Sequence, residues 1–418
     1  MTATRSHVQL QALRARNILI AAHALQHIVS TSLPPLLIFI RSDLGLTGTQ
    51  LGIIVAAGAV ASGLFQFPAG LLTDRFTPKQ LLVVGYCLTL SGLFLLSRAH
   101  TLPGFVLAQA VYGMGNSTFH PASFTDVARA TRRSGGLAMG MALHNIGGNV
   151  GTAAGYSISA ILGTLLGWRA ALGTIVGAGA LLILLFQVIY PELDPEETQD
   201  EEDDPPAQPE SADATTGRKR LRLNTRWIPV YIIAAAAFLS GVFGRGLATW
   251  LPTFFADTRG SSAAVAGVLS TILMLAGAGG SLVGGALGDR MDRSHIVLIA
   301  TLGTAGLIGV MVGVPLTGIA LTLLLLATGF FHSLSRPCLN AITSQVSPRG
   351  KEGSVFGLVF GVMSMGGALA GPLVGNLYDR YSLETAFLVI SGFFVLHGIM
   401  IFIWGRSKYK LSPSQRSS

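Results

Sequence analysis

The stretch "GLLTDR" at residues 70–75 returns in altered form as "GALGDR" at residues 285–290. Each copy ends a long apolar run and keeps a glycine, an aspartate and an arginine at the same spacing. The copies lie 215 positions apart in a chain of 418 residues, close to half its length. A repeat at this interval predicts a duplicated chain with one structural unit in each half.

Further matches follow in the same order along the chain. Their offsets drift slowly, from 216 to 219 positions, as a duplicated six-helix unit would give. The matched pairs are Pro121 with Pro337, residues 135–140 with residues 352–357, and Gly147-Gly148 with Gly366-Gly367.

The composition predicts a membrane protein. Hydrophobic residues make up 50% of the chain and charged residues only 11%, and the mean hydropathy is +0.58. A soluble domain carries about 25% charged residues, and it could not hide this much apolar surface from water. The 52 glycines suit close helix packing in lipid. Cys87 and Cys338 stand in apolar runs and predict neither a disulfide framework nor a metal site.

Twelve apolar runs are long enough to cross about 30 Å of hydrocarbon. Residues 191–226, after the sixth run, are acidic, then rich in proline, serine and alanine, then basic, which predicts a flexible cytoplasmic linker. The predicted fold is therefore an all-α polytopic membrane protein with two pseudo-symmetric six-helix bundles, residues 1–190 and 227–418, the second ending in a short cytoplasmic tail. The predicted spans are 16–40, 49–73, 79–97, 103–126, 135–163, 168–190, 227–255, 263–288, 295–313, 316–341, 353–378 and 384–404.

The placement of lysine and arginine predicts the orientation. With both termini in the cytoplasm, 21 of the 28 basic residues fall in cytoplasmic segments and five in outer loops. The other two, Arg245 and Arg336, lie within predicted spans. Because cytoplasmic loops carry an excess of lysine and arginine, the chain is expected to be a multi-pass protein of the cell (inner) membrane with cytoplasmic termini.

Twelve spans, a central linker and a loop motif after the second and eighth spans resemble the major facilitator superfamily. The family's loop reads roughly G-x-x-x-D-R-x-G-R-K. The first copy has Gly70, Asp74, Arg75 and Lys79, with Thr77 and Pro78 at the later glycine and arginine positions. The second has Gly285, Asp289, Arg290 and Arg293, with Asp292 at the later glycine position. The resemblance implies transport by alternating access, with gating groups at the cytoplasmic mouth: Asp74, Arg75, Lys79, Asp289 and Arg290.

Three further stretches resemble the fosmidomycin resistance group of exporters within that superfamily. "FHPAS" (119–123) and "GLAMGMALHNIGGNVGTAAG" (136–155) are similar to the group's FHPE and GxAM…GGNxG stretches. "HALQHI" (23–28) is similar to its first-span HFxND pattern, with Gln26 and His27 in place of the Asn and Asp. The resemblance implies antiporter-type efflux of a small solute and antibiotic resistance.

Polar residues inside the spans mark the predicted binding site, because ionisable groups in lipid are costly and face a cavity or a partner. Helical spacing places His23 and His27 on one face of the first span. At an offset of 216, His120 of the fourth span corresponds to Arg336 of the tenth, so polar rows of both halves face the axis between them. The predicted solute-binding residues are His23, His27, Asn116, His120, Asn145, Arg245, Trp250, His332, Arg336 and Asn340.

The charges at mid-depth predict the class of solute. Arg245 and Arg336 are accompanied there by no aspartate or glutamate. Two guanidinium groups without acid partners need an anion, and a carboxylate, phosphonate or phosphate accepts the paired hydrogen bonds of arginine. Structural alternatives stay open: Arg336 extending to the cytoplasmic interface, and Arg245 pairing with backbone carbonyls or Asp257.

The predicted function is a secondary active transporter that moves a small anionic organic solute or antibiotic by alternating access, with export favoured. The alternative is an uptake symporter or anion exchanger of the same fold. Protons are the expected coupling ion, carried by His23, His27 or His120, whose side chains titrate near neutral pH. The sequence holds no Walker, HExxH or GxSxG motif, so no enzyme activity, cofactor or metal is predicted. The expected partners are the solute, protons and lipid, without nucleic acid, and the chain is expected to be a monomer.

Overall fold

Thirteen helices make up the part of the chain that the structure describes. The computed structural model describes residues 2–72, 76–134, 137–191, 227–348 and 352–410. Asp74, Arg75 and residues 192–226 of the predicted linker lie outside these ranges. The first half holds α1 (Thr2–Ser30), α2 (Leu33–Leu44), α3 (Gly48–Leu72), α4 (Pro78–Arg98), α5 (Leu102–Ser134), α6 (Leu137–Leu166) and α7 (Trp168–Ile189). The second holds α8 (Ile228–Arg259), α9 (Ala263–Gly288), α10 (Arg293–Gly313), α11 (Gly318–Val346), α12 (Glu352–Arg380) and α13 (Leu383–Lys410).

The first predicted span consists of two helices, α1 and α2. Pro34 and Pro35 follow the break at the start of α2, and a proline lacks the backbone N–H that would continue the hydrogen-bond ladder of α1. Thr31 closes the end of α1, because its backbone N–H and its hydroxyl both donate to the carbonyl of His27, at 3.0 and 2.6 Å. The break therefore lies just beyond His27, one of the predicted site residues.

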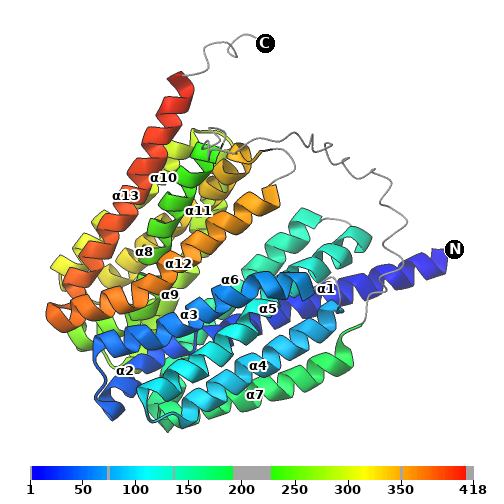
Figure 1. The fold of residues 1–418 in the computed structure, drawn as a ribbon, viewed down its shortest axis with the longest axis horizontal. Helices are drawn as coiled ribbons and strands as arrows, with labels where there is room; N and C mark the ends of the chain where they lie inside the picture. The colour runs from blue at the N-terminus through cyan, green and yellow to red at the C-terminus, as the bar shows by residue number, and fades with distance from the viewer. Residues whose placement is uncertain (1, 73–75, 135–136, 192–226, 349–351, 411–418) are drawn as a thin grey trace, which may run out of the picture.

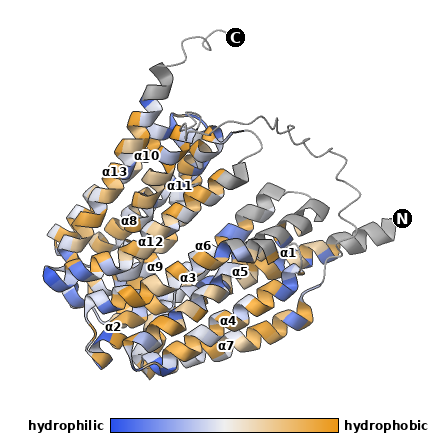
Figure 2. Cartoon of the chain, in the orientation of Figure 1, coloured by the Kyte–Doolittle hydropathy of each residue, from blue (hydrophilic) through white to orange (hydrophobic). Residues whose placement is uncertain are grey.

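The predicted all-α membrane fold is confirmed. With α1 and α2 counted as one span, the thirteen helices make twelve spans. Ten stretches of the described residues are long and apolar enough to cross a membrane, and α5 and α6 are the two helices outside that set. Figure 2 shows hydrophobic residues along the helices of both halves and hydrophilic residues gathered toward helix ends.

The two halves repeat one packing plan. In the first half α1 packs on α6, α3 on α5, and α4 on both α5 and α7. In the second half α8 packs on α12, α9 on α11, and α10 on both α11 and α13. These pairs correspond when the spans are matched in order, so the repeat in the sequence is also a repeat in packing.

The halves are joined at the end of the molecule where α2 lies, called the α2 end below. There α3 packs on α12, α6 on α9, and α2 on α8. The approach of α3 to α12 is close: a Cβ on Gly52 would lie 2.2 Å from the carbonyl oxygen of Gly371. Figure 1 shows the two sets of helices together at the α2 end and apart at the opposite end, where α1 begins and α13 ends.

Glycines also set the contact between α1 and α6. A Cβ on Gly151 would lie 2.0 Å from the carbonyl oxygen of Ala24. Gly151→Ala is therefore expected to push the helices apart and to lower the free energy of unfolding by about 1–3 kcal/mol, measured as a lower melting temperature in detergent. Gly177→Ala on α7 is the matched control, because nothing lies within 4 Å of a Cβ there. Equal melting temperatures for the two variants would contradict this packing.

Candidate functional site

Four histidines meet in the N-terminal half. His23 and His27 come from α1, His120 from α5 and His144 from α6. The His23 ring stacks on the His144 ring with centroids 4.0 Å apart. The rings of His27 and His120 lie edge-on to that of His23, at 4.6 and 5.5 Å. His23 and His144 are buried, whereas His27 and His120 are partly exposed, so the cluster has one buried side and one partly exposed side.

A chain of hydrogen bonds assigns the protons on two of these rings. The carbonyl oxygen of His144 can only accept, so Nδ1 of His23, 2.7 Å away, carries a proton. In a neutral ring the lone pair of His23 is then on Nε2, which accepts from Nε2 of His27 at 3.1 Å. Nδ1 of His27 accepts in turn from the hydroxyl of Thr152 at 2.8 Å. The two Nε2 atoms therefore face each other across one shared proton.

A second polar layer lies beside the histidines and joins three helices. The side-chain amide of Gln26 on α1 donates to Oδ1 of Asn116 on α5 at 2.9 Å. The amide of Asn116 donates to the hydroxyl of Ser62 on α3 at 3.2 Å. Oε1 of Gln26 is buried and has no hydrogen-bond partner. These bonds hold Asn116 in a fixed position and leave one acceptor of the layer open.

The C-terminal half contributes two guanidinium groups. Arg245 on α8 and Arg336 on α11 are both exposed. Within the described ranges neither forms a hydrogen bond or an ion pair. Arg245 is close enough to His27, Tyr112 and Tyr156 of the N-terminal half, and to Arg336, to interact with them electrostatically. The cationic groups of one half therefore face polar residues of the other.

Two more histidines are buried in the C-terminal half. His332 on α11 lies beside the stacked rings of Phe243 and Phe394, with centroids at 5.3 and 5.5 Å, and its Nδ1 has no hydrogen-bond partner. His397 on α13 donates from Nδ1 to the carbonyl of Ala236 at 2.8 Å. His397 was not among the residues predicted from the sequence, although a histidine inside the last apolar run is a visible signal.

The remaining predicted binding residues have different surroundings. Asn145 and Asn340 are exposed. Asn145 lies on the same face of α6 as Tyr156, whose hydroxyl donates to a backbone carbonyl of α8, so this face is turned toward the other half. Trp250 is fully buried and lies edge-on to Tyr378 at 6.0 Å. The structure therefore places Trp250 in the packed α2 end and not beside the arginines.

Three of the predicted gating groups are described. Lys79 donates to the carbonyl of Tyr190 at 3.3 Å, inside the N-terminal half. Asp289 lies 3.8 Å from Arg293, inside the C-terminal half, and Arg290 is exposed. These contacts connect helices of the same half, so they do not join the two bundles in this arrangement.

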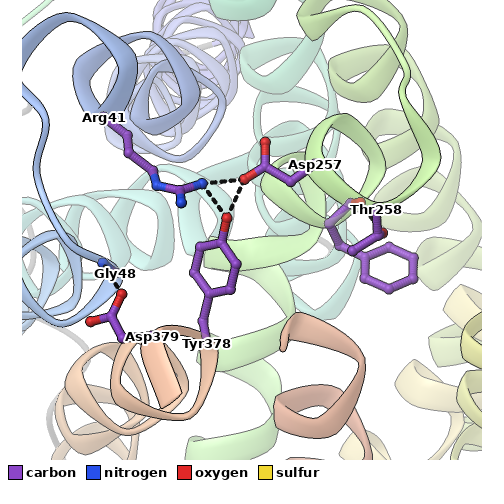
Figure 3. Close-up of polar contacts among 7 residues, drawn as sticks. Arg41, Gly48, Asp257, Thr258, Tyr378 and Asp379 are labelled. Carbon is purple, nitrogen blue, oxygen red and sulfur yellow. Dashed lines mark hydrogen bonds and ion pairs between the residues drawn. The ribbon is translucent and has the colours of Figure 1, made fainter. Parts of the chain in front are cut away.

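Charged residues join the halves at the α2 end, where no gate was predicted from the sequence. Arg41 on α2 donates to the carboxylate of Asp257 on α8 and to the hydroxyl of Tyr378 on α12. That hydroxyl donates to the same carboxylate (Figure 3). The guanidinium group also lies over the Tyr378 ring, 4.6 Å from its centroid. Asp257, considered from the sequence as a partner of Arg245, is thus bound to Arg41 instead.

Asp379 on α12 caps a helix of the opposite half. Its carboxylate accepts from the backbone N–H groups of Gly48 and Thr49 at 2.6 and 2.7 Å, and from the Thr49 hydroxyl at 2.6 Å (Figure 3 draws the bond to Gly48). The first N–H groups of a helix have no partner inside the helix, and the helix N-terminus favours a negative charge. This cap on α3 exists only while the halves are together. Arg41, Asp257, Tyr378 and Asp379 are called the clasp below.

The repeated bundles, their junction at one end and the polar groups that face each other between them define a membrane transport protein. The chain belongs to the Major Facilitator Superfamily, whose sequence profile matches residues 19–317 and 233–418. It is therefore a multi-pass secondary transporter and not an enzyme.

Individual relatives agree with this assignment. The chain is 26% identical over 393 residues to the fosmidomycin resistance protein of Escherichia coli K12, covering 92% of each protein. It is 24% identical over 388 residues to the hexuronate transporter of Bacillus subtilis 168, covering 87% of each. A bacterial homolog of the human lysosomal transporter Spinster, solved in an inward-facing and unoccupied conformation, has the same fold, with a TM-score of 0.75, 15% identity, and coverage of 98% of this chain and 99% of that one. The family resemblance read from the loop motif is confirmed.

Proposed function

We propose that this transporter moves a small anionic organic solute by alternating access, and that the solute binds between the halves at Arg245 and Arg336. The observation that carries the proposal is that both guanidinium groups are exposed and that neither has a hydrogen-bond or ion-pair partner among the described residues. An arginine within a span is costly unless it is paired. A carboxylate or phosphonate would supply both the opposite charge and the paired acceptors that a guanidinium group fits.

The N-terminal half would form the neutral wall of this site. His27 and His120 are partly exposed, and Asn145 is exposed on the face of α6 that is turned toward the other half. Imidazole and amide groups offer hydrogen bonds without a formal charge. An anion would therefore be attracted by the arginines of one half and oriented by the polar groups of the other. His23, Asn116 and His332 would hold the residues that line the site in place, and Asn340 would lie on the side of the arginines.

The arrangement of contacts supports a two-state cycle. The clasp joins the halves at the α2 end, and the predicted orientation puts that end on the outer side of the inner membrane. The structure would then represent a state open toward the cytoplasm. In the opposite state Asp74, Arg75, Lys79, Asp289 and Arg290 would join the halves at the cytoplasmic end.

Export is the proposed direction, because a fosmidomycin resistance protein is among the relatives. Uptake or anion exchange is the alternative, because a hexuronate transporter is also among the relatives. Proton coupling through His23, His27 or His120 stays a prediction from the sequence, and solute flux in proteoliposomes under an imposed pH gradient checks it.

A ligand screen tests the proposed class of solute. Small organic anions are expected to raise the melting temperature of the detergent-purified protein, because a ligand at 100 times its Kd stabilises the folded state by about 2.7 kcal/mol. Each acid is compared with its uncharged amide at the same concentration. Acids that stabilise the protein and exchange across proteoliposome membranes support the proposal. Stabilisation by amides or cations alone would overturn it.

A further inference from the structure

We infer that His23, His27 and His120 bind one divalent transition-metal ion of the zinc, cobalt and nickel type. This three-histidine site lies in the neutral wall of the N-terminal half and goes beyond the proposed anion transport. One ring nitrogen from each histidine lies within 4.8 Å of the other two. Over the described ranges of the chain, this is the one group of three histidine, cysteine, aspartate or glutamate side chains placed so closely.

The separation of the nitrogens is near that of a metal-bound set. Nitrogens about 2.0–2.1 Å from a tetrahedral metal lie about 3.4 Å from one another. Nε2 of His23 and Nε2 of His27 are already 3.1 Å apart. One ring nitrogen of His120 lies within 4.8 Å of a ring nitrogen of each of the other two histidines. The centroid of the His120 ring is 5.5 Å from that of His23 and 5.7 Å from that of His27. A movement of one side chain would therefore complete the ligand set.

The opposite ring nitrogens of His23 and His27 have the partners that metal-binding histidines usually have. Such histidines almost always donate their other nitrogen to a carbonyl, a carboxylate or water, which fixes the orientation of the ring. Nδ1 of His23 donates to the His144 carbonyl at 2.7 Å. Nδ1 of His27 lies 2.8 Å from the Thr152 hydroxyl, which can accept as well as donate when it rotates. A metal ion would take the place of the proton that the two Nε2 atoms share.

The donor set decides which ions fit. Three imidazole nitrogens suit borderline metals such as zinc, cobalt and nickel, whereas magnesium and calcium prefer oxygen ligands. Three protein ligands leave a fourth position open, on the side where His27 and His120 are partly exposed. Arg245, within electrostatic reach of His27, favours an anion over neutral water as the fourth ligand.

Cobalt binding to the full-length protein, purified without a histidine tag, tests the site. Co²⁺ is expected to bind at one ion per chain with visible absorption bands, and Zn²⁺ to displace it, whereas Mg²⁺ does neither. His27→Gln and His120→Gln are expected to remove the bands. Thr152→Val keeps all three rings but removes the partner of His27, and is expected to weaken Co²⁺ binding by about 10–100-fold. His295→Gln is the control, because His295 is exposed on α10 and lies outside the site.

The test distinguishes a loss of metal binding from a loss of folding. The elution volume and melting temperature of each variant are compared with those of the wild type, and Thr152→Val and His120→Gln give two routes that do not require the loss of His27. Loss of cobalt binding in His120→Gln and weaker cobalt binding in Thr152→Val, with wild-type binding in His295→Gln, support the site. Equal binding in all variants, or no stoichiometric binding to the wild type, overturns the inference and leaves the histidines as hydrogen-bonded neighbours only.

Discussion

Replacing Arg336 with glutamine is expected to weaken solute binding by about 10–100-fold, and therefore to lower transport by about 5–50-fold at a solute concentration near the wild-type Kd. The exposed guanidinium group has no hydrogen-bond or ion-pair partner among the described residues, so in the proposed site its hydrogen bonds go to the solute. A hydrogen bond to a charged group contributes about 1.5–3 kcal/mol, and about 1.4 kcal/mol corresponds to a tenfold change in Kd. Arg245→Gln is expected to act in the same direction. Counterflow in proteoliposomes and thermal-shift titration measure both effects.

Two further variants separate anion binding from a structural role. Arg336→Lys keeps the charge but loses the planar fork, so an intermediate Kd is expected. If Arg336 only extends toward the membrane interface, glutamine would leave Kd unchanged. Arg98→Gln is the control, because the Arg98 guanidinium lies over the Phe94 ring, 5.3 Å from its centroid, within one half. Wild-type Kd values in both Arg245→Gln and Arg336→Gln would contradict the proposed anion site.

Most of the fold follows from two features of the sequence. The apolar runs give the spans, because a helix must cover a fixed thickness of hydrocarbon. The repeat gives the division into halves, and the described helices pack in the same order in both. The break between α1 and α2 was not predicted, although Pro34 and Pro35 are a sequence signal for it. The apolar run continues through the break, so hydropathy alone does not reveal it.

The candidate site could be predicted only in part. Helical spacing places His23 and His27 on one face, but it does not say which residues of α5 and α6 they meet. That depends on the rotation of each helix about its axis, which small residues set. A Cβ on Gly148 would lie 2.7 Å from Cε1 of His23, so this glycine lets the ring reach the His144 carbonyl. The meeting of His23 and His27 with His120 is a product of such packing and has no spacing pattern in the sequence.

Two of the four clasp residues could have been paired from the sequence repeat. Arg41 and Asp257 are 216 positions apart, the offset that also relates Pro121 to Pro337. Residues at equivalent positions meet when they lie near the pseudo-twofold axis, so opposite charges at that offset predict a contact. Asp379 had no such signal, because α3 and α12 are not equivalent spans.

Removing the clasp is expected to shift the transporter toward a state open at the α2 end. In Asp257→Asn/Asp379→Ala the side chain that caps α3 and the charge that binds Arg41 are both lost. A helix cap contributes about 0.5–2 kcal/mol, and an exposed ion pair up to about 1 kcal/mol. A combined loss of about 1–2 kcal/mol would change the ratio of the two states by about 5–30-fold. Spin labels at Leu166 and Tyr381, both exposed near the α2 end, report the change as a longer distance in a Cys87→Ser background.

The control for this shift is another aspartate of the same end. Asp43 accepts from the indole N–H of Trp168 at 3.0 Å, inside the N-terminal half, so Asp43→Asn removes a charge without cutting a contact between the halves. Its label distances are expected to match those of the wild type. Because the bonds of Asp379 to Gly48 and Thr49 exist only while the halves are together, the double variant should change the distance distribution even without solute. A distribution identical to that of Asp43→Asn would mean that glycine packing between α3 and α12, and not the clasp, keeps this end closed.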